Sequence, residues 1–298
     1  MVIKKDKIND YELTGSIHTL SIKSPGMVEY VPPEIKPCIK PQSVETKTGD
    51  VITRSIINPN KLEGDLYSFS DFDMAFQTIL TECGIADDYS IIRADMRFDN
   101  FSDDNYLKFA KLNRYLISMV AVTYQSQNCY RTCDLFTHEQ LSVAIKNRAF
   151  ELENYDKFAE SHGTDPAKNR LEERSLRWKN NDLKKEFTEH WFWRWDKALN
   201  HRKLVERKYN EALVKLYEQR KDAFPVQFRK LTDFIIQYQG SIFTKRQLVD
   251  LFGRLGIPNA ERRASYHKTR YGIEFISLQE CKQAIAEIKR ATNQFFDT

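Results

Sequence analysis

One nine-residue segment, residues 91–99, constrains the fold of this chain more than any other. It reads Ile-Ile-Arg-Ala-Asp-Met-Arg-Phe-Asp, so charged and apolar residues alternate over its last seven positions. Side chains two residues apart share one face of a β-strand. Arg93, Asp95, Arg97 and Asp99 would therefore line one face, and the apolar side chains would pack on the other. The charged face suits metal and phosphate chemistry, but it could equally be a solvated surface with cross-strand ion pairs.

The composition is that of a globular protein large enough to bury a core. The chain has 298 residues, of which 41% are apolar and 12% are aromatic, enough for a main domain with an appendage. No apolar run reaches the length of a membrane span, and no apolar stretch follows the charged residues 1–7. Five irregularly spaced cysteines do not suggest a disulfide framework. We expect a soluble, cytoplasmic protein with no membrane partner.

Residues 1–180 alternate between strand-like and helix-like patterns. Helical periodicity extends over residues 68–83, and Ser102 is a candidate N-cap for a second helix. The proline-rich residues 25–50 fit a loop or an edge strand. We predict an α+β domain, an antiparallel β-sheet with helices packed on one face. The expected strands are residues 18–24, 51–57, 93–99 and 169–177, with a hairpin whose arms are residues 121–133 and 141–148.

Charge is unevenly distributed along the chain. Residues 181–298 contain 23 Lys and Arg against 15 Asp and Glu, whereas residues 1–180 contain 23 against 27. Residues 181–225 combine basic residues with three tryptophans in a linking helix that Pro225 ends. The tryptophan cluster favours a docking face onto the main domain over a base-stacking platform. The basic half could bind a polyanion while the acidic half hosts chemistry.

Residues 226–298 form a predicted helical module of the helix-turn-helix type. Thr244 is the expected N-cap of a first helix, residues 256–259 form a Gly/Pro turn, and residues 260–271 follow as a basic second segment. In such a module the second helix reads DNA. The alternative is a solvated surface on a small helical domain. The candidate DNA contacts are the basic side chains Lys245, Arg246, Arg262, Arg263, Lys268 and Arg270.

Four short segments carry a resemblance to a known family. Asn58-Pro-Asn-Lys-Leu62 follows a predicted strand, residues 93–99 have the form R-x-D-x-x-x-D, residues 142–148 end in Ile-Lys-Asn-Arg, and Arg170-Leu-Glu172 has the form R-x-E. In this order they resemble motifs of the rolling-circle replication initiators of plasmids from Gram-positive bacteria. That family also includes relaxases of conjugative elements. The resemblance covers roughly residues 15–180.

The resemblance implies an enzyme that nicks and rejoins DNA at a replication origin. A tyrosine hydroxyl would attack the scissile phosphate and stay attached to the 5′ phosphate, and the freed 3′ hydroxyl would prime synthesis. It also implies a Mg²⁺ or Mn²⁺ ion held by Asp95 and Glu172, with Asp99 or Glu173 beside them. A host helicase and a second copy of the chain would be partners besides DNA. The candidates for the phosphate clamp are Arg93, Lys146 and Arg170.

The nucleophile is less well defined than the carboxylates. In the family it lies on the first arm of the hairpin, usually as Y-x-G, and here Tyr130 is nearest that place, with Tyr124 as the alternative. Neither is followed by the glycine, and Lys146 replaces the tyrosine of the following motif. A different tyrosine, or a domain that no longer cuts, stays possible.

Two other functions fit the same sequence. The first is a non-catalytic origin-binding initiator or transcriptional regulator that kept the fold and lost the nucleophile. The second is a protein-interaction domain whose tryptophan helix docks a helicase or polymerase. Metal-dependent strand transfer at an origin remains the leading prediction because four motifs occur in the family's order.

Overall fold

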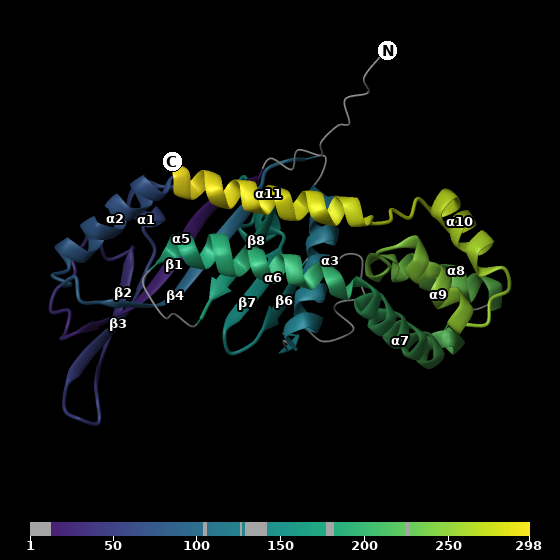
Figure 1. Ribbon diagram of the computed structural model, residues 1–298, viewed down its shortest axis with the longest axis horizontal. Helices are drawn as coiled ribbons and strands as arrows, with labels where there is room; N and C mark the ends of the chain where they lie inside the picture. Colours follow the sequence, from purple (N-terminus) through teal and green to yellow (C-terminus); the bar gives the residue numbers. More distant parts are fainter. Residues whose placement is uncertain (1–12, 104–105, 126, 129–141, 177–181, 224–226) are drawn as a thin grey trace, which may run out of the picture.

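The fold combines a large antiparallel sheet with helices on one of its faces and a helical module at one end (Figure 1). The computed structural model describes residues 13–103, 106–125, 127–128, 142–176, 182–223 and 227–298. The α+β class predicted from the sequence is confirmed. No helix among these residues is both long and apolar enough to cross a membrane.

Within the described residues the sheet has eight strands, in the order β2-β3-β1-β4-β8-β7-β6-β5. Every neighbouring pair is antiparallel. β2 is an edge strand that contains Pro41, one of the two alternatives expected for the proline-rich segment. The strands are β1 (Leu13–Pro25), β2 (Ile39–Glu45), β3 (Val51–Ile57), β4 (Ser90–Asn100), β5 (Gln127–Asn128), β6 (Val143–Lys146), β7 (Phe150–Tyr155) and β8 (Asn169–Ser175).

Helices α2 and α3 cover one face of the sheet. Two short helices lie in connections of the chain, α1 (Asn60–Glu63) between β3 and α2 and α4 (Lys157–Glu160) between β7 and β8. α2 (Phe69–Glu82) begins at Ser68, whose side chain accepts a hydrogen bond from the backbone of Asp71. α3 (Tyr106–Tyr124) continues through residues that were expected to form the first arm of the hairpin. That prediction is wrong for residues 121–124, because the buried side chains before them, including Leu116, Met119 and Val120, set a helical spacing and join the sheet core. The pairing of the two arms is confirmed where the structure describes them, since β5 runs antiparallel to β6.

The linking segment begins as part of the sheet core. It comprises α5 (Leu183–Lys185), a π-helical turn (Glu186–His190), α6 (Trp191–Ala198), a 3₁₀ turn (Leu199–His201), α7 (Arg202–Arg220) and a second 3₁₀ turn (Lys221–Ala223). The side chains of Trp191 and Trp195 are fully buried in the sheet core, whereas Trp193 is exposed. The expected docking face of the tryptophans is therefore confirmed for two of the three.

The helical module has its own core, separate from that of the sheet. It contains α8 (Gln227–Gln237), a 3₁₀ turn (Gln239–Ser241), α9 (Lys245–Arg254) and α10 (Ala260–Tyr271). Thr244 caps α9 by accepting a hydrogen bond from the backbone of Gln247, as predicted. Left-handed backbone at Gly256 and Asn259 shapes the turn between α9 and α10.

The last helix, α11 (Leu278–Asp297), leaves the module and returns to the sheet (Figure 1). Residues 226–298 were expected to form one module, but the buried face of α11 belongs to the sheet core. Phe295 contacts the rings of Phe69 and Phe72 at the start of α2. The module is thus an insertion of residues between α7 and α11, two helices that both contact the sheet domain.

Gly15 of β1 sets how closely α11 approaches the sheet. A Cβ atom at this position would lie 2.8 Å from the carbonyl oxygen of Ala291 in α11 and 3.2 Å from the methyl carbon of Met96. The first neighbour is backbone, which cannot move aside as a flexible side chain could. Glycine is therefore required by packing at this point of the strand.

We expect Gly15→Ala to destabilise the protein by about 1–3 kcal/mol, because the added methyl group overpacks the contact between β1 and α11. Chemical denaturation followed by circular dichroism measures this change. The matched control is Gly253→Ala in α9, where a Cβ would meet nothing within 4 Å. This control should gain about 0.5–1 kcal/mol from helix propensity. Equal effects of the two substitutions would contradict the packing argument.

Candidate functional site

Alternate residues of the three central strands β4, β8 and β7 form a charged face on the side of the sheet opposite α3, α6 and α11. Antiparallel pairing places Asp95, Arg174 and Glu151 in one cross-strand row, with two further rows beside it. Side chains opposite each other in an antiparallel pair lie on the same face. We call the following nine side chains the charged face: Asp95, Arg97, Asp99, Glu151, Glu153, Tyr155, Arg170, Glu172 and Arg174.

Arg174 is the centre of the first two rows. Its Nη1 donates to Glu151 Oε1 at 2.7 Å, and its Nη2 lies 2.7 Å from Glu153 Oε2 and also donates to Glu172 Oε2. Its Nε lies 3.9 Å from Asp95 Oδ2. One guanidinium therefore contacts four carboxylates from three strands, which we call the carboxylate cluster.

Asp95 is buried beneath Arg93, another predicted site residue. Arg93 donates to both carboxylate oxygens, from Nε at 2.7 Å and from Nη2 at 2.5 Å, a bidentate pair. Burial raises the pKa of Asp95, and the bonds from Arg93 oppose that rise. Arg93 is thus engaged with Asp95.

Glu172 is joined to a tyrosine and a histidine. The Tyr155 hydroxyl donates to Glu172 Oε1 at 2.8 Å, and His18 Nδ1 lies 3.8 Å from the same oxygen. Burial alone would raise the pKa of Glu172, but the positive charge of Arg174, the Tyr155 hydrogen bond and the other cations nearby together outweigh burial, and the pKa is lowered. Burial lowers the pKa of His18 to about 4, against the attraction of Glu172. Both groups are therefore in their basic forms at neutral pH.

His18 reaches this face because β1 is irregular there. The pairing of β1 with β4 shifts by one residue between Ile17 and Thr19, and such a bulge redirects a side chain. The side-chain amide of Asn60 donates to the carbonyl oxygen of Ile17 at 2.9 Å and accepts from the backbone of Leu66 at 3.0 Å. Asn60 belongs to the Asn58–Leu62 motif, which therefore supports the bulge that carries His18.

In the third row of the charged face, which contains Asp99, Arg170 and Tyr155, the charged side chains form ion pairs. Arg170 donates to both oxygens of Asp99, at 2.5 Å and 3.0 Å, and both side chains are almost fully buried. Arg97 pairs with Asp65, which follows α1, and its Nε lies 3.5 Å from Asp99. Asp99 and Arg170, predicted as a metal ligand and a phosphate contact, thus bind each other.

Two predicted residues lie away from the charged face. Glu173 projects from the opposite face, where the indole nitrogen of Trp195 donates to its carboxylate at 2.5 Å. Tyr124 lies at the end of α3, its ring against Phe150 and its hydroxyl buried without a hydrogen-bond partner. Residues 172 and 173 cannot both face Asp95 because neighbours alternate in a strand. The expectation that Glu173 lies beside Asp95 is wrong, and Tyr124 is not at the predicted site.

The predicted nucleophile Tyr130 lies outside the described residues. Lys146 is on the charged side of β6, with Nζ 3.4 Å from Glu151. Among the described residues, Tyr155 places its hydroxyl on the predicted carboxylate Glu172. We did not expect Tyr155 at this site from the sequence, nor its neighbours there: His18, Glu151, Glu153 and Arg174. The alternation of Phe150, Leu152 and Asn154 with polar residues in β7 was the signal for three of these, whereas nothing in the sequence marked the bulge at His18.

The described carboxylates do not fit a divalent cation as they are arranged. Among the described residues, no group of three or more His, Cys, Asp or Glu side chains is placed to hold a metal ion. A guanidinium separates the members of the carboxylate cluster, while Mg²⁺ and Mn²⁺ need oxygen ligands converging on one point. The predicted ligands Asp95 and Glu172 share a face, but arginines bind both.

The predicted DNA contacts of the module differ in their surroundings. Arg246 donates to the Glu206 carboxylate, from Nε at 2.9 Å, and Lys245 lies 3.8 Å from Glu261. Arg263 is half-buried beside a cavity. The basic side chains of α10 that are exposed to solvent are Arg262, Lys268 and Arg270.

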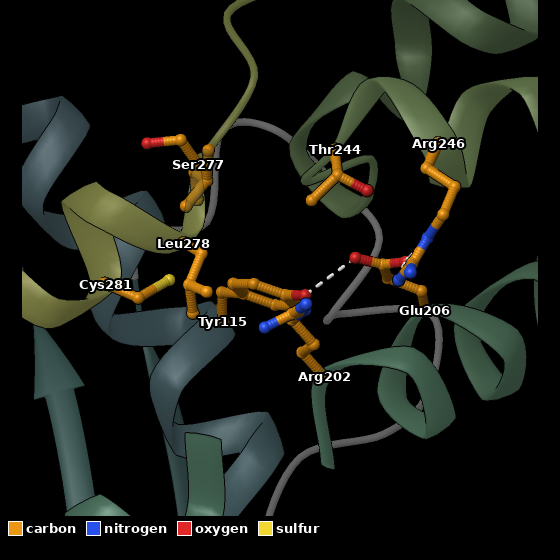
Figure 2. Close-up of a pocket in the computed structure, with 9 residues that line it drawn as sticks. Tyr115, Arg202, Glu206, Thr244, Arg246, Ser277, Leu278 and Cys281 are labelled. Atoms are coloured by element: carbon orange, nitrogen blue, oxygen red, sulfur yellow. Dashed lines mark hydrogen bonds and ion pairs between the residues drawn. The ribbon is translucent and has the colours of Figure 1, made fainter. Parts of the chain in front are cut away.

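Glu206 belongs to the junction between the sheet domain and the module. Figure 2 shows the Tyr115 hydroxyl pointing at Glu206, to which it donates a hydrogen bond at 2.8 Å. Both residues line a cavity of about 240 Å³. Residues from α3, α7, α9 and α11 line this cavity. The ion pair between Arg246 and Glu206 therefore links α9 to α7. This structural role explains Arg246 without a contact to DNA.

Comparison with known proteins adds a remote structural likeness. No family model and no curated protein matches this chain. A solved structure described as the rolling circle replication initiator protein from Geobacillus stearothermophilus aligns with 76% of this chain and 85% of its own, at 10% identity and a TM-score of 0.28. A likeness at this level supports no conclusion about activity.

Glu173 makes the stability of the protein depend on pH. Burial raises its pKa from 4.5 to about 8, although the Trp195 bond opposes the rise. The folded protein therefore binds a proton more tightly than the unfolded chain, and the resulting stability is lost as pH rises from 4.5 to 8. We expect Glu173→Gln to be increasingly more stable than the wild type over this range, by up to about 1.4 kcal/mol per pH unit.

Denaturant titrations at several pH values measure this difference. The control is Glu189→Gln, which removes the same charge from an exposed position in the turn that leads into the helix of Trp195. A constant difference between Glu173→Gln and the wild type from pH 5 to pH 8 would show that Glu173 is ionised throughout.

Proposed function

We propose that this protein binds DNA at a replication origin and transfers a DNA strand through a tyrosine hydroxyl. The observation that carries the proposal is the convergence of all four motif segments at one face of the sheet. Asn60 supports the β1 bulge, Asp95 and Glu172 share the charged face, and Lys146 lies at its side. The first and last of these segments, residues 58–62 and 170–172, are more than one hundred residues apart in the chain, so only the fold brings them together.

The charged face offers groups that strand transfer requires. A phenol becomes an effective nucleophile when a base takes its proton and cations offset the charge of the phosphate. His18 and the Glu172 carboxylate are unprotonated at neutral pH and can accept that proton, and Lys146 can contact the phosphate. The oxygen of the tyrosine would bond to phosphorus, the bond to the 3′ oxygen would break, and the 3′ oxygen would take up a proton.

Two tyrosines are candidates for the nucleophile within this proposal. Tyr130 comes from the resemblance, and Tyr155 comes from the geometry because its hydroxyl already donates to Glu172. We assign the attack to Tyr130 and the orientation of Glu172 to Tyr155. Burial raises the pKa of Tyr155 most, and the negative charge of Glu172 raises it further. Both effects disfavour ionisation of the Tyr155 hydroxyl.

The module would supply DNA binding through α10. This helix follows α9 after a tight turn, as in a helix-turn-helix, and three exposed cations project from it. Tyr266, half-exposed on the same helix, adds a polar and aromatic contact. The helicase partner and the homodimer expected from the resemblance remain predictions.

The first test is the covalent intermediate. Supercoiled DNA carrying the region around the coding sequence should be converted to nicked circles with protein on the 5′ end, detected by denaturing gel and peptide mass spectrometry. Tyr130→Phe should abolish this adduct and leave DNA binding unchanged. Tyr155→Phe should slow the reaction without removing the adduct, because it disturbs only the orientation of Glu172.

Tyr124→Phe is the matched control for this experiment. Its hydroxyl is buried on the helix-covered side of the sheet, so its loss should not affect the adduct. A nucleotide found on Tyr155 would move the nucleophile there. No adduct from the wild type, with or without Mn²⁺, would refute strand transfer and favour a non-catalytic origin binder or transcriptional regulator. The pairing of Asp95, Asp99 and Glu172 with arginines is the observation that keeps this second function in view.

The second test concerns the module. Replacing Arg262 and Arg270 by Gln should weaken binding to duplex DNA and lower the slope of log K against log salt by up to about 2, one unit for each lost phosphate contact. Fluorescence anisotropy over a salt series measures the slope. Lys36→Gln with Lys40→Gln removes the same charge from exposed positions near the sheet edge. Equal slopes for both double variants would argue against DNA binding by α10.

A further inference from the structure

The carboxylate cluster has the composition of a divalent metal site but a different occupant. Asp95, Glu151, Glu153 and Glu172 come from three neighbouring strands and face one another across the charged face. Four carboxylates this close repel one another unless a cation lies between them. The Arg174 guanidinium lies there, in contact with all four.

Two of the three side-chain nitrogens of Arg174 form hydrogen bonds with carboxylates. Both terminal nitrogens donate to carboxylates, and Nε faces Asp95 without completing a hydrogen bond. The side chain is 16% exposed. Glu172 and Asp95, its two most buried partners, have side chains only 3–4% exposed. A buried carboxylate left without its cation is strongly destabilising, so this arginine cannot be replaced by solvent.

A guanidinium and a divalent cation exclude each other at this position. Mg²⁺ and Mn²⁺ bind oxygens at about 2.0–2.2 Å around one point, whereas a guanidinium holds carboxylates apart along its planar edge. The lengths of 2.7 Å to both Glu151 and Glu153 are those of charge-assisted hydrogen bonds. Metal binding would require the Arg174 side chain to leave.

We propose that Arg174 serves as the built-in cation of this site, holding the carboxylate cluster ionised and oriented in place of Mg²⁺ or Mn²⁺. Arg174 is then a positioning residue: it fixes Glu172, which in turn contacts Tyr155 and His18. The proposal rests on the contacts of Arg174 and is independent of whether the protein cuts DNA. It replaces the metal cofactor that the resemblance implied.

The test measures binding of Mn²⁺ itself by electron paramagnetic resonance of the free ion. Wild-type protein should leave the free-ion signal unchanged. Arg174→Gln removes the cation and leaves the carboxylates to gather around a metal, so it should bind one Mn²⁺ at least tenfold more tightly than the wild type. The double variant with Glu172→Gln should lose that binding again. Arg148→Gln, an exposed arginine on the turn after β6, is the control for loss of charge.

Two outcomes would overturn the proposal. One is stoichiometric Mn²⁺ binding by the wild type that Glu172→Gln removes, since Arg174 would then yield its place to the metal. The other is a folded Arg174→Gln protein that binds no more Mn²⁺ than the wild type. If Arg174→Gln does not fold, the wild-type titration still decides, and Arg174→Lys, which keeps the charge, should fold and exclude Mn²⁺.

Formation of the protein–DNA adduct provides a second, independent test of the role of Arg174. If the protein transfers DNA strands as proposed, its adduct should form equally in EDTA and in Mn²⁺. Dependence of the adduct on Mn²⁺ would overturn the role of Arg174 without affecting strand transfer. The Mn²⁺ titrations would stand even if no adduct formed under any condition.

Discussion

The pairing of buried charges across β4, β8 and β7 is the constraint on which the rest of this structure depends. Ionised carboxylates are costly to bury, and each one on the charged face is matched by an arginine, histidine or tyrosine from its own or a neighbouring strand. These charge pairs form only in the observed register of β4, β8 and β7. A shift of one residue would move the apolar side chains of β4 onto the charged side and bury its charges against the helices.

The same register divides the sheet between two tasks. Its apolar face packs against α2, α3, α6 and α11, and the buried side chains of these helices form one core with it. Its charged face contributes little to the core, so its residues could be selected for chemistry. Glu172 and Glu173 illustrate the division, because these neighbours lie on opposite faces and their pKa values shift in opposite directions.

Much of the fold could be predicted because local patterns agreed with the final packing. The alternation in residues 91–99, the caps at Ser68 and Thr244, and the docking of Trp191 and Trp195 all follow from short-range periodicity. Strict alternation also separates Glu172 from Glu173. What failed depended on distant contacts. The extra turn of α3 is set by packing on the sheet, the bulge at His18 by Asn60, and the position of α11 by Gly15. The central role of Arg174 needed the register of three strands, which no single segment determines.

The return of α11 to β1 has a consequence for synthesis. The first strand of the sheet emerges from the ribosome long before the helix that covers part of it, with more than 250 residues between their starts. The intervening α8–α10 unit has a core formed largely from nearby residues, so it can close while the apolar side of β1 is still bare. Translation must pass residue 297 before α11 can cover β1, and until then the apolar side chains that this helix buries stay exposed on the nascent chain, the kind of surface that favours aggregation.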